Sequence, residues 1–147
     1  MFSLAFHAFL KIGEIPEQSL SLHNPNLLHI DQLALDHHSI SLTFSTFKHS
    51  QGQKFTLKIN KNNNTAVCHV SNLQQYIQMR GTGPGPIFMC LSNTLVTRAE
   101  FNAQLKHALQ FCNFDPKCFK CHSFRIGAAK TAEAQGLSDR QIRQLGR

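Results

Sequence analysis

The sequence has no tryptophan, a single tyrosine and few acidic residues. Only eight Asp and Glu oppose 15 Lys and Arg, so the net charge is +7 at pH 7. A basic excess of this size is compatible with a polyanion partner, but charge alone does not separate nucleic acid from a membrane surface. Charged residues make up 16% and hydrophobic residues 41% of the chain, which excludes an intrinsically disordered protein. The 147 residues suffice for one domain with its own core.

Long hydrophobic runs and targeting signals are also missing. No apolar run approaches the roughly 18 residues that a membrane-spanning helix needs, so we expect no membrane insertion. No basic segment precedes the first apolar stretch and no small-residue cleavage site follows it, which argues against export. The five cysteines are odd in number and have no paired spacing, so we expect them to be reduced. These features predict an intracellular protein, nuclear if its host is a eukaryote.

Hydrophobic spacing predicts an opening helix, a small sheet and further helices. Apolar residues recur at helical spacing over 2–10, over 70–77 ahead of Gly81, and over 101–112. Alternation over 39–45 and again over 55–59 predicts a β-hairpin whose basic tip spans 48–53. Shorter apolar stretches at 28–35 and 87–91 predict two more short strands.

Two capping boxes mark helix starts in the last third of the chain. Thr97 with Glu100 opens one helix, which Asp115-Pro116 ends, and Ser138 with Gln141 opens another. Helix-compatible residues run between them from 122 to a C-cap at 136. We therefore expect one α+β domain over 1–147, mainly α, with a small antiparallel sheet. Its single core should contain nine large apolar residues: Phe6, Phe9, Leu42, Phe44, Leu57, Phe101, Leu105, Leu109 and Phe124.

His122 and Arg125 form the pair of residues that points most directly to chemistry. They are three residues apart and so share one face of a helix, where both can donate hydrogen bonds to a single phosphate. The plain alternative is that His122 caps the helix and Arg125 pairs with a carboxylate.

The segments around this pair resemble the catalytic domain of tyrosine recombinases and phage integrases. The similarity includes His122 to Ala129, the stretch 136–142, and the last three residues, Leu-Gly-Arg. It is greatest to recombinases of animal mobile elements, which carry a Tyr-x-x-x-Arg-Gly-x-x-Pro-Gly-Pro stretch much like 76–86 of this chain.

The resemblance implies a helical domain with a small sheet that breaks and rejoins double-stranded DNA through a 3'-phosphotyrosine, together with other protomers. It implies phosphoryl transfer with no metal and no cofactor. In this family, two Arg and a His or Trp stabilise charge on the phosphate, and a hairpin Lys protonates the leaving 5'-oxygen. His122 and Arg125 match the family's His-x-x-Arg, and Lys48 at the hairpin tip matches its Lys. Lys54, on the other side of the tip, is the alternative acid and otherwise a contact to the DNA backbone.

The sequence departs from the family at two catalytic positions. Lys11, in Lys-Ile-Gly-Glu, stands where the family has its first Arg, and it lacks the fork that grips two phosphate oxygens. The family's nucleophilic Tyr would lie about two helical turns beyond Arg147. Tyr76 lies on a helix whose spacing points it toward the core, so we interpret it as structural. We expect a partial catalytic domain, without the family's N-terminal DNA-binding domain, that does not complete strand transfer alone.

A non-catalytic helix-turn-helix is the main alternative. Ala132, Gly136 and Ile142 have the spacing of such a unit, in which small residues let two helices pack and an apolar residue locks them. Three arginines would then face DNA: Arg140, Arg143 and Arg147. This module would read bases without cleaving the strand.

Two cofactor interpretations depend on the cysteines near His122. The residues from Cys118 to His122 spell the Cys-x-x-Cys-His signature of covalent haem attachment, which requires an exported chain. Zinc could be bound by Cys112, Cys118, Cys121 and His122, but so short a segment would strain tetrahedral geometry. We expect neither group.

Overall fold

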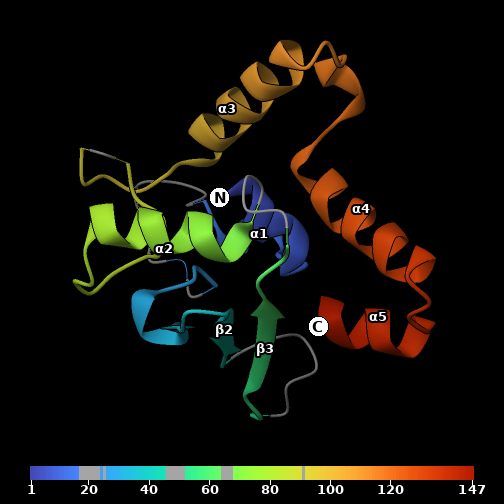
Figure 1. Ribbon diagram of the computed structural model, residues 1–147. Coiled ribbons are helices and arrows are strands. Elements are labelled where there is room, and N and C mark those ends of the chain that lie inside the picture. The colour runs from blue at the N-terminus through green and yellow to red at the C-terminus, as the bar shows by residue number, and fades with distance from the viewer. Residues whose placement is uncertain (17–23, 25, 46–51, 64–67, 91) are drawn as a thin grey trace.

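The computed structural model describes the chain except residues 17–23, 25, 46–51, 64–67 and 91 (Figure 1). The described part is an α+β fold, mainly helical, as the sequence predicts. Its helices are α1 (Phe2–His7), α2 (His69–Arg80), α3 (Arg98–Phe111), α4 (Cys121–Ala134) and α5 (Asp139–Gly146). Three-residue turns of 3-10 helix are η1 (Ile12–Glu14), η2 (Ile30–Gln32) and η4 (Pro116–Cys118). Among the described residues, none of the helices is both long and apolar enough to span a membrane.

A small antiparallel sheet confirms the predicted hairpin. Its strands are β1 (Leu33–Leu35), β2 (Ser39–Phe44) and β3 (Phe55–Asn60), in that order. The register pairs Leu42 with Leu57 and Phe44 with Phe55. Alternate residues along β2 and β3 point to the core, which is why strict alternation identified the hairpin. The hairpin tip with Lys48 lies outside the described residues.

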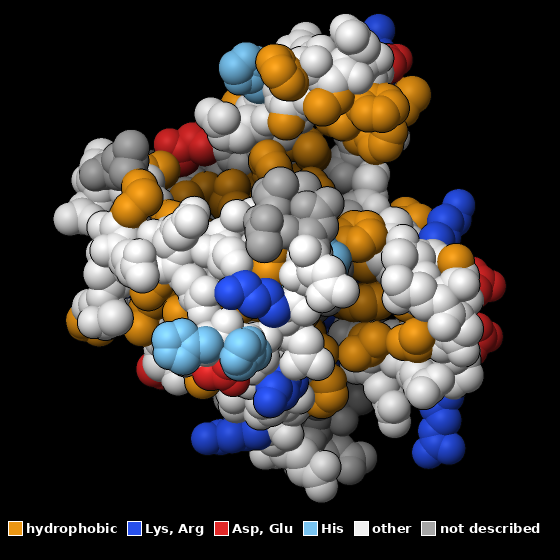
Figure 2. Space-filling model, viewed as in Figure 1, with side chains coloured by type: hydrophobic (Ala, Val, Ile, Leu, Met, Phe, Trp, Pro, Cys, Tyr) orange, Lys and Arg blue, Asp and Glu red, His pale blue; other side chains and the backbone are white. Residues whose placement is uncertain are grey.

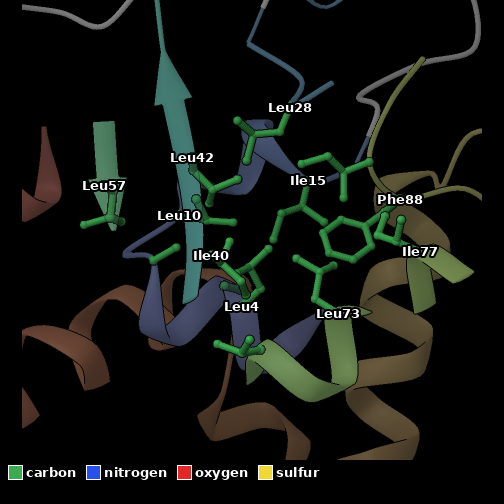
Figure 3. Packing of buried hydrophobic residues seen from close by; sticks show 14 of the residues in the cluster. Leu4, Leu10, Ile15, Leu28, Ile40, Leu42, Leu57, Leu73, Ile77 and Phe88 are labelled. Carbon is green, nitrogen blue, oxygen red and sulfur yellow. The ribbon is translucent and has the colours of Figure 1, made fainter. Parts of the chain in front are cut away.

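The main core lies between the sheet, α1 and α2. Ile40 and Leu42 of β2 face Leu4 of α1, while Leu73 and Ile77 of α2 close the other side (Figure 3). The spacing of three and four residues on α2 places its apolar side chains on one stripe that faces this core. The helix ends where the sequence predicts, at a glycine with φ of 83°.

Two histidine rings in contact join the end of α1 to the start of α2. The rings of His7 and His69 have centroids 4.1 Å apart and are tilted by 33°. His69 Nε2 lies 3.0 Å from the carbonyl oxygen of Asn60, so this nitrogen carries the proton and donates. Burial lowers the pKa of both imidazoles and so favours their neutral forms.

The predicted strand at 87–91 is wrong for the described residues 87–90, and residue 91 lies outside the described part. Ile87 and Phe88 are buried, and the isolated bridges here pair Pro86, just before the segment, with His29 and Met89 with Leu95. Proline has no N–H to donate, so a ladder cannot continue through residue 86. The stretch 28–35 is also strand only in its last three residues, because η2 occupies 30–32.

The helix α3 leaves the core and, with η4 and the start of α4, forms an arm (Figure 1). Phe101 and Leu105 in its first half are buried, whereas Phe111 at its end is 87% exposed. The predicted apolar face is therefore right for the first half of α3. It is wrong for Ala108 and Cys112, which are exposed because the helix runs beyond the body of the protein.

The buried residues form two clusters rather than the single expected core. Phe9, Ala128 and Ala132 make the second cluster, on which Ile142 of α5 packs. This cluster fixes α4 and α5 against α1. Three predicted core residues are only half-buried: Phe6, Leu109 and Phe124.

Phe101→Ala should lower the free energy of unfolding by about 3 to 5 kcal/mol, because it empties a fully buried aromatic site. The Phe101 ring meets that of Phe2 edge-on, with centroids 5.0 Å apart, and only 1% of the residue is exposed. Urea unfolding measures the change. Phe111→Ala on the same helix is the control and should stay within about 0.5 kcal/mol of the wild type. Equal losses for the two variants would contradict this packing.

Candidate active site

The start of α4 presents His122 and Arg125. The backbone N–H of Lys120, the N-cap residue, donates to Ser123 Oγ at 3.0 Å, which begins the helix one residue before His122. His122 is therefore in the first turn and is exposed, while Arg125 lies one turn deeper and is half-buried. His122 does not cap the helix, contrary to the plain alternative.

The guanidinium of Arg125 is held by the last helix. Its Nη2 donates to the carbonyl oxygen of Gly146. A Cβ on Gly146 would lie 2.9 Å from that same nitrogen, a distance that real Cβ contacts do not show. A side chain at position 146 would therefore push the flexible end of Arg125 away from its present place.

Arg147 is buried and paired with Glu14 of η1. Its Nη2 lies 2.9 Å from Glu14 Oε2, and the exposed fraction of its side chain is 0%. The guanidinium also lies over the ring of Phe44, 3.5 Å from the centroid. Burial lowers the pKa of Arg147, Glu14 opposes that effect, and Arg125 adds to it. The expectation that Arg147 faces DNA is therefore contradicted.

Glu14 also anchors the backbone of Lys11. The Lys11 N–H donates to Glu14 Oε2 at 2.7 Å, so one carboxylate oxygen receives both this N–H and the Arg147 guanidinium. The first turn around η1 and the last residues of the chain are thereby joined. Phe44, beneath Arg147, is the last residue of β2.

The structure therefore gathers part of the predicted catalytic set. The backbone of Lys11 and the side chain of Arg125 both lie beside the Glu14–Arg147 pair. His122 lines a cleft between α3 and α4 that Ile12, the neighbour of Lys11, also lines. Lys48 is outside the described residues.

The other predicted DNA contacts lie on the surface. Lys54 is exposed and lines a separate cleft with Asp31, His29 and Gln32. Arg140 and Arg143 are exposed on α5.

The helix pair α4–α5 has the packing expected of a helix-turn-helix. Gly136 takes a φ of 86° in the turn between the helices, a conformation that strains other residues. Ala132 is buried, and Ile142 packs on its cluster. The two helices thus contact each other as the alternative expects, with Arg140 and Arg143 outward and Arg147 inward.

Tyr76 is bound to the backbone within the body of the protein. Its hydroxyl donates to the carbonyl oxygen of Met89 at 3.1 Å and accepts from the N–H of the same residue at 2.8 Å. Its ring packs against Phe88, with centroids 5.4 Å apart. These contacts fit the structural interpretation of Tyr76.

The cysteine-based zinc set is not assembled. Cys121 Sγ lies 2.6 Å from Asn102 Oδ1, and Cys118 Sγ lies 3.9 Å from Asp115 Oδ2. Within the ranges that the structure describes, no three His, Cys, Asp or Glu residues are grouped so as to hold a metal ion.

Sequence reasoning missed Glu14 and Gly146 as residues that organise the site. Glu14 is the last residue of the Lys-Ile-Gly-Glu motif, and Gly146 is the middle residue of the Leu-Gly-Arg motif. Their role arises from the contact between those motifs, which local spacing does not reveal. The available signal was Glu14, an acidic residue close to the candidate phosphate-binding Lys11. A carboxylate at a phosphate site would repel the phosphate unless a further cation paired with it.

Comparison with known proteins identifies no family: no family model, curated protein or solved structure matches this chain.

Glu14→Gln should lower the free energy of unfolding by about 3 to 5 kcal/mol, because it leaves the buried Arg147 charge without its partner. Urea unfolding at pH 7 measures this loss. Glu133→Gln, which changes an exposed carboxylate on α4, is the matched control and should have almost no effect. If both variants unfold at the same urea concentration, the pair does not join the two ends of the fold.

Gly146→Ala should displace the Arg125 guanidinium while the protein stays folded. The new Cβ would contact only the flexible end of Arg125, and alanine favours a helix over glycine by about 0.5 to 1 kcal/mol. The Nε–H NMR signal of Arg125, assigned with Arg125→Lys, should shift by much more than the other arginine signals. An unchanged signal with an unchanged fold would refute the contact between Arg125 and Gly146.

Proposed function

We propose that this chain is a DNA-binding domain of the tyrosine recombinase type, whose site holds a phosphate of double-stranded DNA. Lys11, His122 and Arg125 contact the phosphate oxygens, and Lys48 on the hairpin reaches the same phosphate. The partners are DNA and other protomers of the same kind, in an intracellular compartment, the nucleus in a eukaryote.

The observation that carries this proposal is the convergence of three distant segments. The backbone of Lys11, the end of β2 at Phe44 and the guanidinium of Arg125 all lie beside the buried Glu14–Arg147 pair. These are the segments that carry the residues similar to the recombinase site. Arg147 lies 2.9 Å from Glu14, so the pair adds no net charge beside the Arg125 guanidinium.

The same contacts argue that the chain binds DNA without completing strand transfer alone. Lys11 offers one ammonium where the family has a bidentate guanidinium. The hydroxyl of Tyr76 is occupied by Met89, and attack in line on a phosphate would need that oxygen about 3 to 3.5 Å from phosphorus. Cleavage would require a tyrosine from another source.

A non-catalytic helix-turn-helix remains a second candidate. The packing of α5 on α4 and the exposure of Arg140 and Arg143 favour it. This function differs from the first in its readout, because side chains in the major groove discriminate bases whereas phosphate contacts do not.

Binding of this chain to duplex DNA should depend steeply on salt and weakly on sequence. Each phosphate contact contributes a slope of about −0.9 to the plot of log affinity against log salt. Arg125→Gln should therefore weaken binding to every DNA sequence and make the slope of log affinity against log salt less negative by about one. His122→Ala should also weaken binding to every sequence. Fluorescence anisotropy at several salt concentrations measures this.

Arg143→Ala serves as the comparison variant for that experiment. It should alter binding to all sequences equally and by less than Arg125→Gln. A loss confined to particular sequences in Arg143→Ala would support the helix-turn-helix instead. A flat salt response of the wild type would refute both functions.

A further inference from the structure

A cleft of about 400 Å³ lies within the arm, between α3 and the start of α4. We call it the arm cleft; its walls are Ile12, side chains of α3, Pro116 and residues 119–122. The helix α3 leads away from the sheet (Figure 1), while Ile12 and Cys121 on the cleft wall also pack against the main core. His122 stands on its wall, which connects the arm cleft to the proposed phosphate site.

Four positively charged or protonatable side chains line the arm cleft: Arg98, Lys106, Lys120 and His122. No acidic residue is among the described residues that line it. The nearest acids along the chain are engaged elsewhere. Glu100 accepts from the Thr97 N–H at 2.7 Å, and Asp115 accepts from the Lys117 N–H at 2.9 Å. The cleft is thus arranged for an anion.

The first turn of α4 adds to this positive potential. Cys121 and His122, the first two residues of the helix, are both on the cleft wall. The N–H groups of a first helical turn have no partner within the helix and carry the positive end of its dipole. A phosphate in the arm cleft would meet these groups as well as the side chains.

An apolar recess of about 140 Å³ adjoins the arm cleft. The two cavities share Leu105, Leu109, Phe119 and Lys120, and the recess is otherwise lined mainly by aromatic rings. Phe119 is 39% exposed, and hydrophobic side chains gather on the surface of the arm (Figure 2). An anion alone would leave this apolar surface in water.

A ligand that matches both parts has a phosphate joined to a flat apolar group. In duplex DNA the bases are stacked inside the helix, so only phosphates and sugars would reach the cleft and the recess would gain nothing. An unpaired nucleotide presents its base face, and basic grooves with aromatic side chains are typical of proteins that bind single strands.

We infer that the arm cleft binds an unpaired nucleotide of a DNA strand. Its phosphate lies among Arg98, Lys106 and the α4 start, and its base packs against Phe119 in the recess. This inference rests on the proposed DNA function, because His122 then lies between the nucleotide and the phosphate held with Arg125. The protein would thus prefer DNA whose strand ends or opens beside the site.

The test compares a blunt duplex with the same duplex carrying a four-nucleotide thymidine overhang. The wild type should bind the overhang duplex at least fivefold more tightly, as stacking of one base on an aromatic ring allows. Phe119→Ala should abolish this preference and leave blunt-duplex binding unchanged. Lys106→Gln, at an exposed position, should also reduce the preference for the overhang duplex. This variant tests the cleft if Phe119→Ala does not fold.

Two exposed residues outside the cleft provide matched controls. Phe111→Ala on α3 is the control for Phe119→Ala, and Lys130→Gln on α4 is the control for Lys106→Gln. Both control variants should still prefer the overhang duplex to the blunt duplex. Equal affinity of the wild type for both duplexes would overturn the inference, as would equal losses in Phe111→Ala and Phe119→Ala.

Binding of a thymidine tetranucleotide alone separates this inference from the proposed function. One outcome is that the tetranucleotide binds, that Phe119→Ala abolishes this binding, and that no duplex binds. This result would support nucleotide binding in the arm cleft and contradict the recombinase-type function. If duplex binds with the predicted salt dependence but neither the overhang nor the tetranucleotide is favoured, the proposed function stands and the arm cleft falls. If no DNA binds, both fall.

Discussion

The buried ion pair between Glu14 and Arg147 is the interaction on which the arrangement of the site depends. It joins residues 133 positions apart, and it holds the end of α5 against η1. The Lys11 N–H also donates to Glu14, and the Phe44 ring lies under the Arg147 guanidinium, although the buried Arg147 Nε has no hydrogen-bond partner among the described residues. With Arg147 fixed, the carbonyl of Gly146 is fixed as well. The guanidinium of Arg125 is thus positioned through the backbone next to this pair.

The electrostatics of the site follow from this arrangement. Arg147 is paired with Glu14, so the pair contributes no net charge next to the Arg125 guanidinium. Partial burial of Arg125 strengthens its interaction with an anion, because fewer waters screen it. The same burial limits its motion, since one of its donors is already occupied by Gly146.

The arm extends this basic region away from the core. The first half of α3 is anchored through Phe101, and the second half carries its apolar residues into solvent because no other element covers them. The arm cleft, which lies beside this half of the helix, is lined by both cations and aromatic rings. His122 belongs to both regions: it is one helical turn from Arg125 and also lines the arm cleft. The core supports the fixed part of the site and the arm supplies the open part.

The sequence by itself determined that the helices and the two hairpin strands exist, and it marked some of their ends, since these depend on neighbours a few residues away. Period-two alternation at 39–45 and the Thr97–Glu100 capping box are examples, and the structure has both. It also placed His122 and Arg125 on one helix face. Tertiary structure alone decided that Arg147 turns inward to Glu14, that Gly146 lies against the Arg125 guanidinium, and that the described buried residues form two clusters. Each of these results joins segments far apart in the chain, and the spacing of residues within a segment contains no information about which distant segment will pack against it.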